Sequence, residues 1–194
     1  MKRPKIVGLG GTPRSGSSTE MALRACLSIA EAEGADTVII TGQDIVLPIY
    51  MPELQERSAE AIRMIEHIRT CDGLIIASPG YHGSMSGLIK NAIDYIEDLR
   101  KDSRSYLEGR AVGCILGAGG GQALGTALMS LRSVVHALRG WPTPMGATLN
   151  TSGKLFDADG RCIDEPARQQ LELVAKQVTH FARMQLAASG PSKS

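Results

Sequence analysis

The residues best suited to chemistry stand near the start of the chain, in the segment Gly-Gly-Thr-Pro-Arg-Ser-Gly-Ser-Ser-Thr at 10–19. An apolar run at 5–9 precedes it and a helical pattern at 20–33 follows it. A glycine-rich turn before a helix is suited to binding an anion, because the first N–H groups of the helix are unpaired. Arg14 adds a planar set of donors that matches phosphate oxygens. Hydroxyl groups come from Thr12, Ser17, Ser18 and Thr19.

Two stricter phosphate motifs are absent from this segment. A Walker loop ends in Gly-Lys-Ser/Thr, and no lysine stands between Lys5 and Lys90. The dinucleotide pattern G-x-G-x-x-G fails because Pro13 occupies its third glycine position. The segment therefore favours one terminal phosphate, as in a mononucleotide. The alternative is a plain strand-to-helix loop whose hydroxyls cap the helix, although a cap needs one hydroxyl and no arginine.

Strand-like and helical patterns alternate along the chain, which predicts an α/β fold with a doubly wound five-stranded parallel sheet and helices on both faces. The expected strands are 5–10, 36–41, 72–78, 110–117 and 145–150. The expected helices are 20–33, 58–70, 88–99, 124–139 and 166–186. We expect a single domain over 1–186 and a disordered tail at 187–194.

Two further glycine-rich segments follow expected strands, at 79–87 and 118–123. Parallel strands bring such segments to one edge of the sheet, where doubly wound folds bind ligands. The backbone N–H groups of 79–84 suit a flat heteroaromatic ring, along which Tyr81 either packs or lies half-buried on its own domain. His82 is either a ligand contact or proton source, or a solvated loop histidine.

The other polar residues of these segments leave similar alternatives. Ser84 and Ser86 stand just before a helix, so each is either a cap or a ligand contact. Gly119, Gly120 and Gly121 have no side chains, so they act through backbone donation or close approach.

The composition excludes several classes of protein. A net charge of +1 over 194 residues and 4% aromatic residues disfavour a nucleic-acid or membrane partner. No apolar run is long enough to span a membrane, and the first residues do not resemble a signal peptide. The four cysteines are widely spaced, which indicates reduced thiols in a cytoplasmic protein and no metal site.

An enzyme that relies on its own nucleophile is also disfavoured. The G-x-S-x-G elbow is absent, since Met85 stands at the nucleophile position between Gly83 and Gly87. Paired carboxylates near the glycine-rich segments are missing. We therefore expect no catalytic side chain and a cofactor that supplies the reactivity.

Three motifs together resemble those of the NAD(P)H-dependent FMN reductase family. Residues 11–19 resemble its G-S-x-R-x-x-S-x-N/T loop, and residues 79–91 resemble its P-x-Y-x-x-S-x-x-G-x-x-K-N segment. Residues 119–121, with Leu131 and Arg132 after them, resemble its third glycine-rich loop. The resemblance implies a flavodoxin-like fold, non-covalent FMN, and a homodimer or homotetramer with the site near the subunit interface.

The resemblance also implies roles for individual residues. The FMN phosphate would be held by Thr12, Arg14, Ser17, Ser18 and Thr19. The isoalloxazine ring would lie against Pro79, Tyr81, His82, Gly83 and Ser84, and its other edge would be bordered by Gly119, Gly120 and Gly121. Gly80 stands where many members carry Glu and His82 where many carry Asn, so His82 is a candidate modulator of the flavin.

The activity implied is a flavin reductase that passes hydride from NAD(P)H to N5 of FMN and then reduces an acceptor by a ping-pong scheme. The acceptor would be free FMN, a quinone, an azo compound, a metal ion or dioxygen. Arg104, Arg110 and Arg132 are the candidates for contacting a 2′-phosphate. The alternatives are a flavodoxin-like FMN electron carrier or FMN-binding regulatory module without efficient NAD(P)H oxidation, and a phosphate-ester enzyme or nucleotide binder without flavin.

Overall fold

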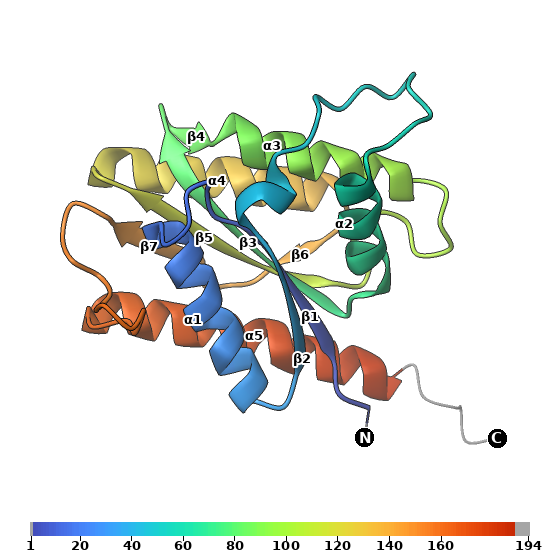
Figure 1. Ribbon diagram of the computed structural model, residues 1–194. Coiled ribbons are helices and arrows are strands. Elements are labelled where there is room, and N and C mark those ends of the chain that lie inside the picture. Colours follow the sequence, from blue (N-terminus) through green and yellow to red (C-terminus); the bar gives the residue numbers. More distant parts are fainter. Residues whose placement is uncertain (1, 189–194) are drawn as a thin grey trace.

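Parallel strands form the central layer of the protein, which a computed structural model describes over residues 2–188 (Figure 1). The strands are β1 (Lys5–Gly10), β2 (Asp36–Ile40), β3 (Gly73–Tyr81), β4 (Ser84–Met85), β5 (Ala111–Ala118), β6 (Trp141–Pro142) and β7 (Ala147–Asn150). Their order is β2-β1-β3-β5-β6, with β7 also paired to β5 and β4 paired antiparallel to β3. The doubly wound α/β prediction is confirmed, with seven strands instead of five. The two additional strands, β4 and β6, have two residues each, which is too short for a recognisable alternation.

Helices cover both faces of this sheet. They are α1 (Ser18–Ala32), α2 (Ala59–Thr70), α3 (Gly87–Asp94), α4 (Gly121–Ala137) and α5 (Glu165–Ala188), with 3₁₀ helices η1 (Gly42–Ile45) and η2 (Tyr95–Leu99). Figure 1 shows α1 and α5 below the sheet and α2, α3 and α4 above it. The single helix expected over 88–99 is an α-helix that continues as the 3₁₀ helix η2. The last helix continues to Ala188, and residues 189–194 of the expected tail lie outside the described residues.

The two faces of the sheet are both apolar because each is packed against helices. Along β1, Ile6 belongs to the core between the sheet and helices α1 and α5. Val7 and Leu9 belong to the core on the other face, between the sheet and helices α2, α3 and α4. The same alternation continues in β3, where Ile75 and Ile76 face opposite cores. Burial on both sides explains why these strands have continuous apolar sequences.

The long connection between β2 and α2 is held in place by α3. The side-chain amide of Asn91 donates to the carbonyls of Leu47 and Pro48, at 3.2 and 2.9 Å, and its oxygen accepts from the N–H of Tyr50 at 2.8 Å. The Tyr95 hydroxyl donates to Pro48 as well, at 3.0 Å. The segment nevertheless exposes apolar side chains, which are Val46, Ile49, Met51 and Leu54.

The end of this connection that precedes α2 is fixed by an ion pair. Arg57 donates to both carboxylate oxygens of Asp98, at 2.8 and 3.0 Å, and its guanidinium lies 4.8 Å from the centre of the Tyr50 ring. A bidentate pair of this kind is stronger than an ordinary surface pair.

Among residues 2–188, no helix is long and apolar enough to cross a membrane.

Candidate functional site

Three glycine-rich segments meet at the carboxyl edge of the sheet because the strands before them are neighbours. Gly10 at the end of β1 pairs with Ala77 of β3, and Pro79 near the end of β3 pairs with Gly117 of β5. The N–H of Gly11 also donates to the carbonyl of Ala77 at 3.0 Å. The segments 11–17, 82–83 and 119–120 therefore leave the sheet side by side.

The first segment ends in the N-terminus of α1. Ser17 is the N-cap of this helix, and its hydroxyl accepts from the N–H of Glu20 at 3.3 Å. The Thr12 hydroxyl donates to the carbonyl of Arg14 at 3.1 Å, which tightens the turn. Ser17 and Thr19 are buried, whereas Arg14 is exposed. Ser17 is therefore the one hydroxyl of this segment that caps the helix. A loop that served only to cap the helix would need no more than this.

Capping leaves several donors of this segment free. Over the described residues, the backbone N–H groups of Ser17, Ser18 and Thr19 have no hydrogen-bond acceptor in the chain. The guanidinium of Arg14 likewise has no partner within residues 2–188. Unpaired N–H groups at a helix N-terminus, next to an exposed arginine, fit an anion such as a phosphate group.

The second segment is a β-hairpin. Strands β3 and β4 pair through Tyr81 and Ser84, and the turn between them consists of His82 and Gly83. Both turn residues have positive φ, 51° and 82°, as a two-residue type I′ turn requires. His82 therefore adopts a left-handed conformation, which is more common for Asn than for most residues. Asn is also the residue that many members of the family named in the sequence analysis carry at this position. The hairpin leaves the Tyr81 side chain 54% exposed.

The two serines after this turn have different partners. The Ser84 hydroxyl lies 2.9 Å from that of Ser130 in α4, so it ties the hairpin to that helix. Ser86 is the N-cap of α3 and accepts from the N–H of Ile89 at 3.2 Å. Of the two alternatives for Ser86, the structure favours the cap.

Gly80 has a packing reason to lack a side chain. A Cβ at this position would lie 3.4 Å from Cβ of Ala118 and 3.5 Å from Cβ of Ala127. One carbon would make ordinary contacts, but the longer side chain of a glutamate would have to extend past these two alanines. Because α4 lies close to the hairpin here, a glycine fits at position 80, where many members of the family named in the sequence analysis carry Glu.

The third segment leads into α4 without a side-chain cap. Gly119, Gly120 and Gly121 are exposed, and Gly120 is the N-cap position of the helix. The three glycines present only backbone at the edge of the sheet, beside the hairpin.

Two of the three basic candidates for a 2′-phosphate lie at the opposite end of the sheet. Arg110, which precedes β5, is fully buried and donates to the carbonyls of Arg69, Cys71 and Tyr106 at 2.7, 3.2 and 2.8 Å. Arg104 donates to the carbonyl of Cys71 at 3.0 Å. Arg104 and Arg110 therefore lie away from the three glycine-rich segments, with their guanidinium groups bonded to backbone carbonyls.

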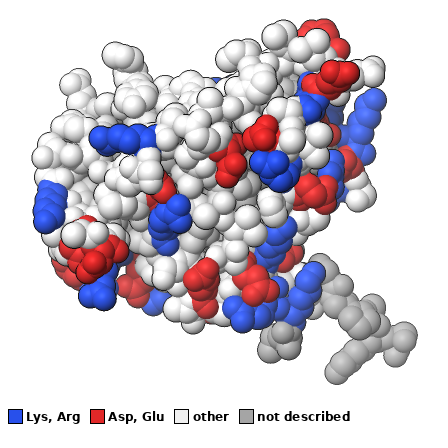
Figure 2. Space-filling model, in the orientation of Figure 1, with Lys and Arg blue, Asp and Glu red and all other residues white. Residues whose placement is uncertain are grey.

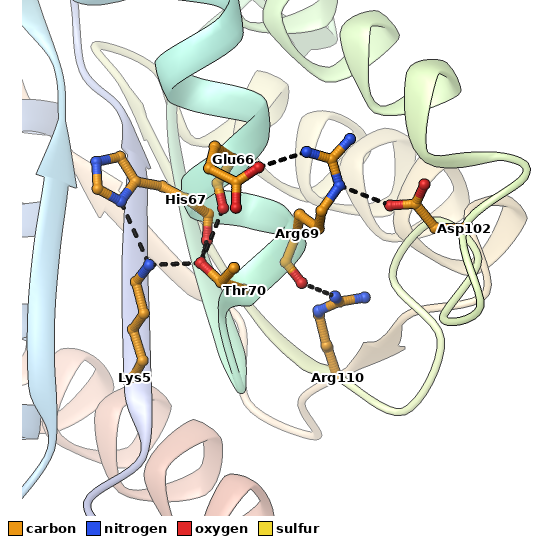
Figure 3. Close-up of polar contacts among 7 residues, drawn as sticks. All are labelled: Lys5, Glu66, His67, Arg69, Thr70, Asp102 and Arg110. Atoms are coloured by element: carbon orange, nitrogen blue, oxygen red, sulfur yellow. Dashed lines mark hydrogen bonds and ion pairs between the residues drawn. The ribbon is translucent and has the colours of Figure 1, made fainter.

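Figure 3 shows the surroundings of Arg110 at the C-terminal end of α2. Lys5, the first residue of β1, reaches His67 and Thr70 of this helix there, at 3.3 and 2.7 Å. Because β1 and β5 are parallel, this cluster marks the amino ends of the strands. Arg132 of α4, the remaining candidate, donates weakly to the carbonyl of Pro144 at 3.4 Å.

Two residues beside the first segment were not identified from sequence. Thr151, just after β7, approaches the same point as Thr19: a Cβ on Gly117 would lie 3.2 Å from the Thr151 methyl and 2.9 Å from the Thr19 methyl. Glu20 of α1 is 4% exposed, and its carboxylate accepts from the N–H of Gly16 at 2.9 Å. The only sequence signal for Glu20 is its position three residues after Ser17, as in a capping box.

The site has little charge and no reactive thiol. Figure 2 shows charged side chains mainly over the right and lower parts of the molecule, whereas its upper left, towards the carboxyl edge, is mostly uncharged. Burial raises the pKa of the Cys114 thiol to about 12 and also raises the pKa of Cys26. Residues 2–188 contain no group of three His, Cys, Asp or Glu side chains that could hold a metal ion.

Comparisons with known proteins agree with the geometry. Residues 4–153 match the family model of NADPH-dependent FMN reductase. The chain is 31% identical over 178 residues to the NADPH azoreductase of Bacillus sp. (strain OY1-2), a match that covers 91% of this chain and 92% of that protein. It is 29% identical over 177 residues to an NAD(P)H-dependent FMN reductase of Pseudomonas aeruginosa, covering 87% and 89%.

Among solved structures, the fold is similar to that of the flavoenzyme FerB from Paracoccus denitrificans, an NAD(P)H:(acceptor) oxidoreductase. The TM-score is 0.77 at 19% identity, over 94% of this chain and 98% of that chain. A flavodoxin, the WrbA-like protein from Agrobacterium tumefaciens, also matches, with a TM-score of 0.64 at 14% identity. These two likenesses concern the fold.

The family match spans most of the chain, from before β1 to just after β7, and includes all three segments at the carboxyl edge. The cofactor is accordingly FMN and the co-substrate is NAD(P)H. The chain belongs to the NADPH-dependent FMN reductase family of flavin oxidoreductases.

Proposed function

We propose that the protein is an NAD(P)H-dependent flavin reductase that holds FMN at the carboxyl edge of its sheet. The observation that carries this proposal is the meeting of three segments there: unpaired N–H groups beside Arg14, an exposed hairpin, and a glycine-rich helix start. The phosphate of FMN would lie at the first segment, its flat ring against the hairpin, and the border of that ring beside the glycine-rich helix start. The proposed phosphate contacts are Thr12, Arg14, Ser17, Ser18 and Thr19. The proposed ring contacts are Pro79, Tyr81, His82, Gly83, Ser84, Gly119, Gly120 and Gly121.

The residues of the first segment fit a phosphate in both charge and geometry. Successive N–H groups at Ser17, Ser18 and Thr19 point along the start of α1, where the helix carries a partial positive charge. Arg14 supplies the formal charge and is free to turn towards the ligand. The buried Thr19 hydroxyl lies 3.4 Å from that of Ser17, so it orients the N-cap as well.

The hairpin and the glycines would position the ring and leave one side of it open. Bound FMN supplies the redox chemistry, taking electrons from NAD(P)H and passing them to an acceptor. Tyr81 would line the open side, because its side chain is exposed beside the turn. Gly119 to Gly121 place no side chain in the way of a nicotinamide or an acceptor. One open side that serves both molecules in turn supports a ping-pong scheme.

The acceptor in this proposal is a small molecule: free flavin, a quinone, an azo compound or a metal ion. The name of the Bacillus relative, NADPH azoreductase, favours azo compounds within this group. The mostly uncharged surface near the carboxyl edge suits the planar quinones and azo compounds of this group (Figure 2).

We further propose that the protein works as a homodimer or homotetramer. Exposed apolar side chains on α4 and on the connection before α2 include Met129 and Ile49, which are 64% and 71% exposed. A cavity of about 460 Å³ between α3, η2 and α4 adds apolar surface, with Tyr50, Ile93 and Val134 among its lining residues. Apolar surface of this kind is typical of protein interfaces.

A cytoplasmic location is proposed from the thiols. All four cysteines are free, and Cys26, Cys71 and Cys114 are buried. Free cysteines are typical of a reducing compartment.

The decisive experiment reconstitutes the purified protein with FMN and adds NADPH without oxygen. A reductase loses its visible flavin absorbance at once and regains it when an azo dye or a quinone is added. A yellow protein that dithionite bleaches but NADPH does not would instead be the electron carrier or regulatory module. A protein that stays colourless after reconstitution would contradict FMN binding altogether.

Arg14→Ala tests where the phosphate lies. Loss of a charged donor should weaken FMN binding by about tenfold. Arg168→Ala is the control, because Arg168 pairs with Glu165 on the surface of α5. Equal FMN affinity in both variants would contradict the placement of the phosphate at this segment.

A further inference from the structure

A buried carboxylate stands directly behind the proposed phosphate segment. Glu20 lies in the first turn of α1, and its side chain is 5% exposed. One carboxylate oxygen accepts from the N–H of Gly16 at 2.9 Å. The other accepts from Nε and Nη2 of Arg24 at 2.9 and 2.7 Å. A nearly buried acid at this place needs a reason, because burying a charge is unfavourable unless it is paired and hydrogen-bonded.

The arrangement is a capping box that is displaced by one residue. In a usual capping box, the acid at the third helical position returns to the N–H of the N-cap residue. Here the N-cap Ser17 accepts from the N–H of Glu20, but the carboxylate bonds to the N–H of Gly16, one residue earlier. The N–H of Ser17 is therefore left unpaired within residues 2–188, together with those of Ser18 and Thr19.

The same bond fixes the shape of the turn. Gly16 has a φ of +72°, and no heavy atom would lie within 4 Å of a Cβ placed there. The N–H of Gly16 is bonded to Glu20, so this hydrogen bond, together with the one from Thr12 to the carbonyl of Arg14, fixes the turn. Removal of the carboxylate would let the turn that precedes Ser17 relax.

The charge of Glu20 is offset by Arg24. A carboxylate so close to a phosphate would repel it, and the guanidinium of Arg24 bonds to that carboxylate from the next turn of the helix. Arg24 itself is 55% exposed, so its positive charge also faces solvent. The pair therefore contributes geometry to the anion site without a net negative charge.

We propose that Glu20 is a positioning residue that shapes the turn for a phosphate group, and that Arg24 neutralises it. This proposal rests on the proposed FMN site, specifically on the phosphate lying at the start of α1. It predicts that the Glu20–Arg24 pair determines how strongly the protein prefers FMN to riboflavin, which lacks the phosphate.

The test compares binding of FMN and of riboflavin to flavin-free protein by quenching of flavin fluorescence. Glu20→Ala should weaken FMN binding by about tenfold, the loss expected for one buried hydrogen bond to a charged group, with riboflavin affinity changed less than about twofold. Arg24→Ala should weaken FMN binding at least about threefold, since the carboxylate then lacks its counter-charge. The double variant Glu20→Gln/Arg24→Ala should recover most of that loss, because Gln still offers an oxygen to Gly16 and carries no charge.

The control is Glu31→Ala, which removes an acid from the other end of the same helix, where Glu31 accepts from the Thr37 hydroxyl. If Glu20→Ala lowers thermal stability but leaves the ratio of FMN to riboflavin affinity unchanged, Glu20 is only a helix cap and the proposal is overturned. If Glu20→Ala does not fold, the Arg24 single variant and the double variant decide, and equal affinities in these two would also overturn it. A wild-type protein that binds FMN and riboflavin equally would instead refute the placement of the phosphate.

Discussion

Replacement of Gly10 by alanine tests whether the first segment must begin in its observed conformation. Gly10 ends β1 with a φ of +143°, a value that L-amino acids rarely adopt. A Cβ at this position would lie 1.9 Å from the carbonyl oxygen of Ala77 in the neighbouring strand β3. That oxygen accepts the hydrogen bond from Gly11 that holds the segment to the sheet, so the methyl group cannot be accommodated without moving it.

The expected cost follows from three contributions. The lost backbone hydrogen bond is worth about 1 kcal/mol. The strained backbone adds about 1–3 kcal/mol, and displacement of a packed strand adds about 1–3 kcal/mol. Gly10→Ala should therefore lower the free energy of unfolding by at least about 3 kcal/mol. In a domain of this size, that loss corresponds to a decrease in Tm of about 6–12 °C.

Gly16→Ala is the matched control, since Gly16 belongs to the same segment and also has a positive φ, but faces open space. Its cost is limited to the left-handed conformation of a residue with a side chain, about 1 kcal/mol. Thermal denaturation of the flavin-free proteins, followed by circular dichroism, measures both changes. Equal decreases in Tm for the two variants would refute the argument, because the contact with Ala77 would then have no energetic consequence.

Three further predictions follow from the ion pair, the buried arginine and the hairpin. The Arg57 guanidinium holds the pKa of Asp98 below its usual value, so this carboxyl stabilises the fold above its unfolded pKa and loses that effect as the pH falls through its lowered folded pKa. The stability difference between wild type and Asp98→Asn in urea should accordingly shrink between about pH 5 and pH 2, and a constant difference would contradict it. Arg110→Lys should lower the free energy of unfolding by about 2–4 kcal/mol, because one ammonium cannot reach three buried carbonyls in the geometry of a guanidinium; a urea midpoint close to that of wild type would exclude this role. His82→Gly should raise Tm and His82→Val should lower it, each by the equivalent of about 1 kcal/mol, since φ is 51° at this position; the opposite order would show that the side chain of His82 stabilises the turn.

Local patterns were sufficient for the main elements of the fold. Runs of β-branched and apolar residues, such as 36–40 and 73–78, predicted strands because both faces of a parallel sheet are buried. Glycine-rich stretches after them predicted turns at the carboxyl edge, where the structure places all three. The helices were predicted to within a few residues at most ends, with α4 starting three residues early and the helix after Gly87 ending as 3₁₀.

The sequence could not predict contacts between residues that are distant in the chain. Asn91 reads as an ordinary helical residue, yet it makes three hydrogen bonds with a segment more than 40 residues away. Arg104 and Arg110 were placed among the cofactor candidates by charge alone, and only the parallel order of β1 and β5 puts them at the far edge. Nothing in their local sequence shows which carbonyls they reach.

The sequence by itself determined the alternation of strands and helices, the three glycine-rich segments and the family, because these depend on residue types at short spacing. The tertiary structure alone decided how the segments meet: the approach of α4 to Gly80, the contact of Ser84 with Ser130, and the position of Thr151 near Thr19. The physical reason is that a hydrogen bond or a van der Waals contact depends on where two groups lie in space. That position is set by how the helices pack on the sheet, which no short stretch of residues specifies.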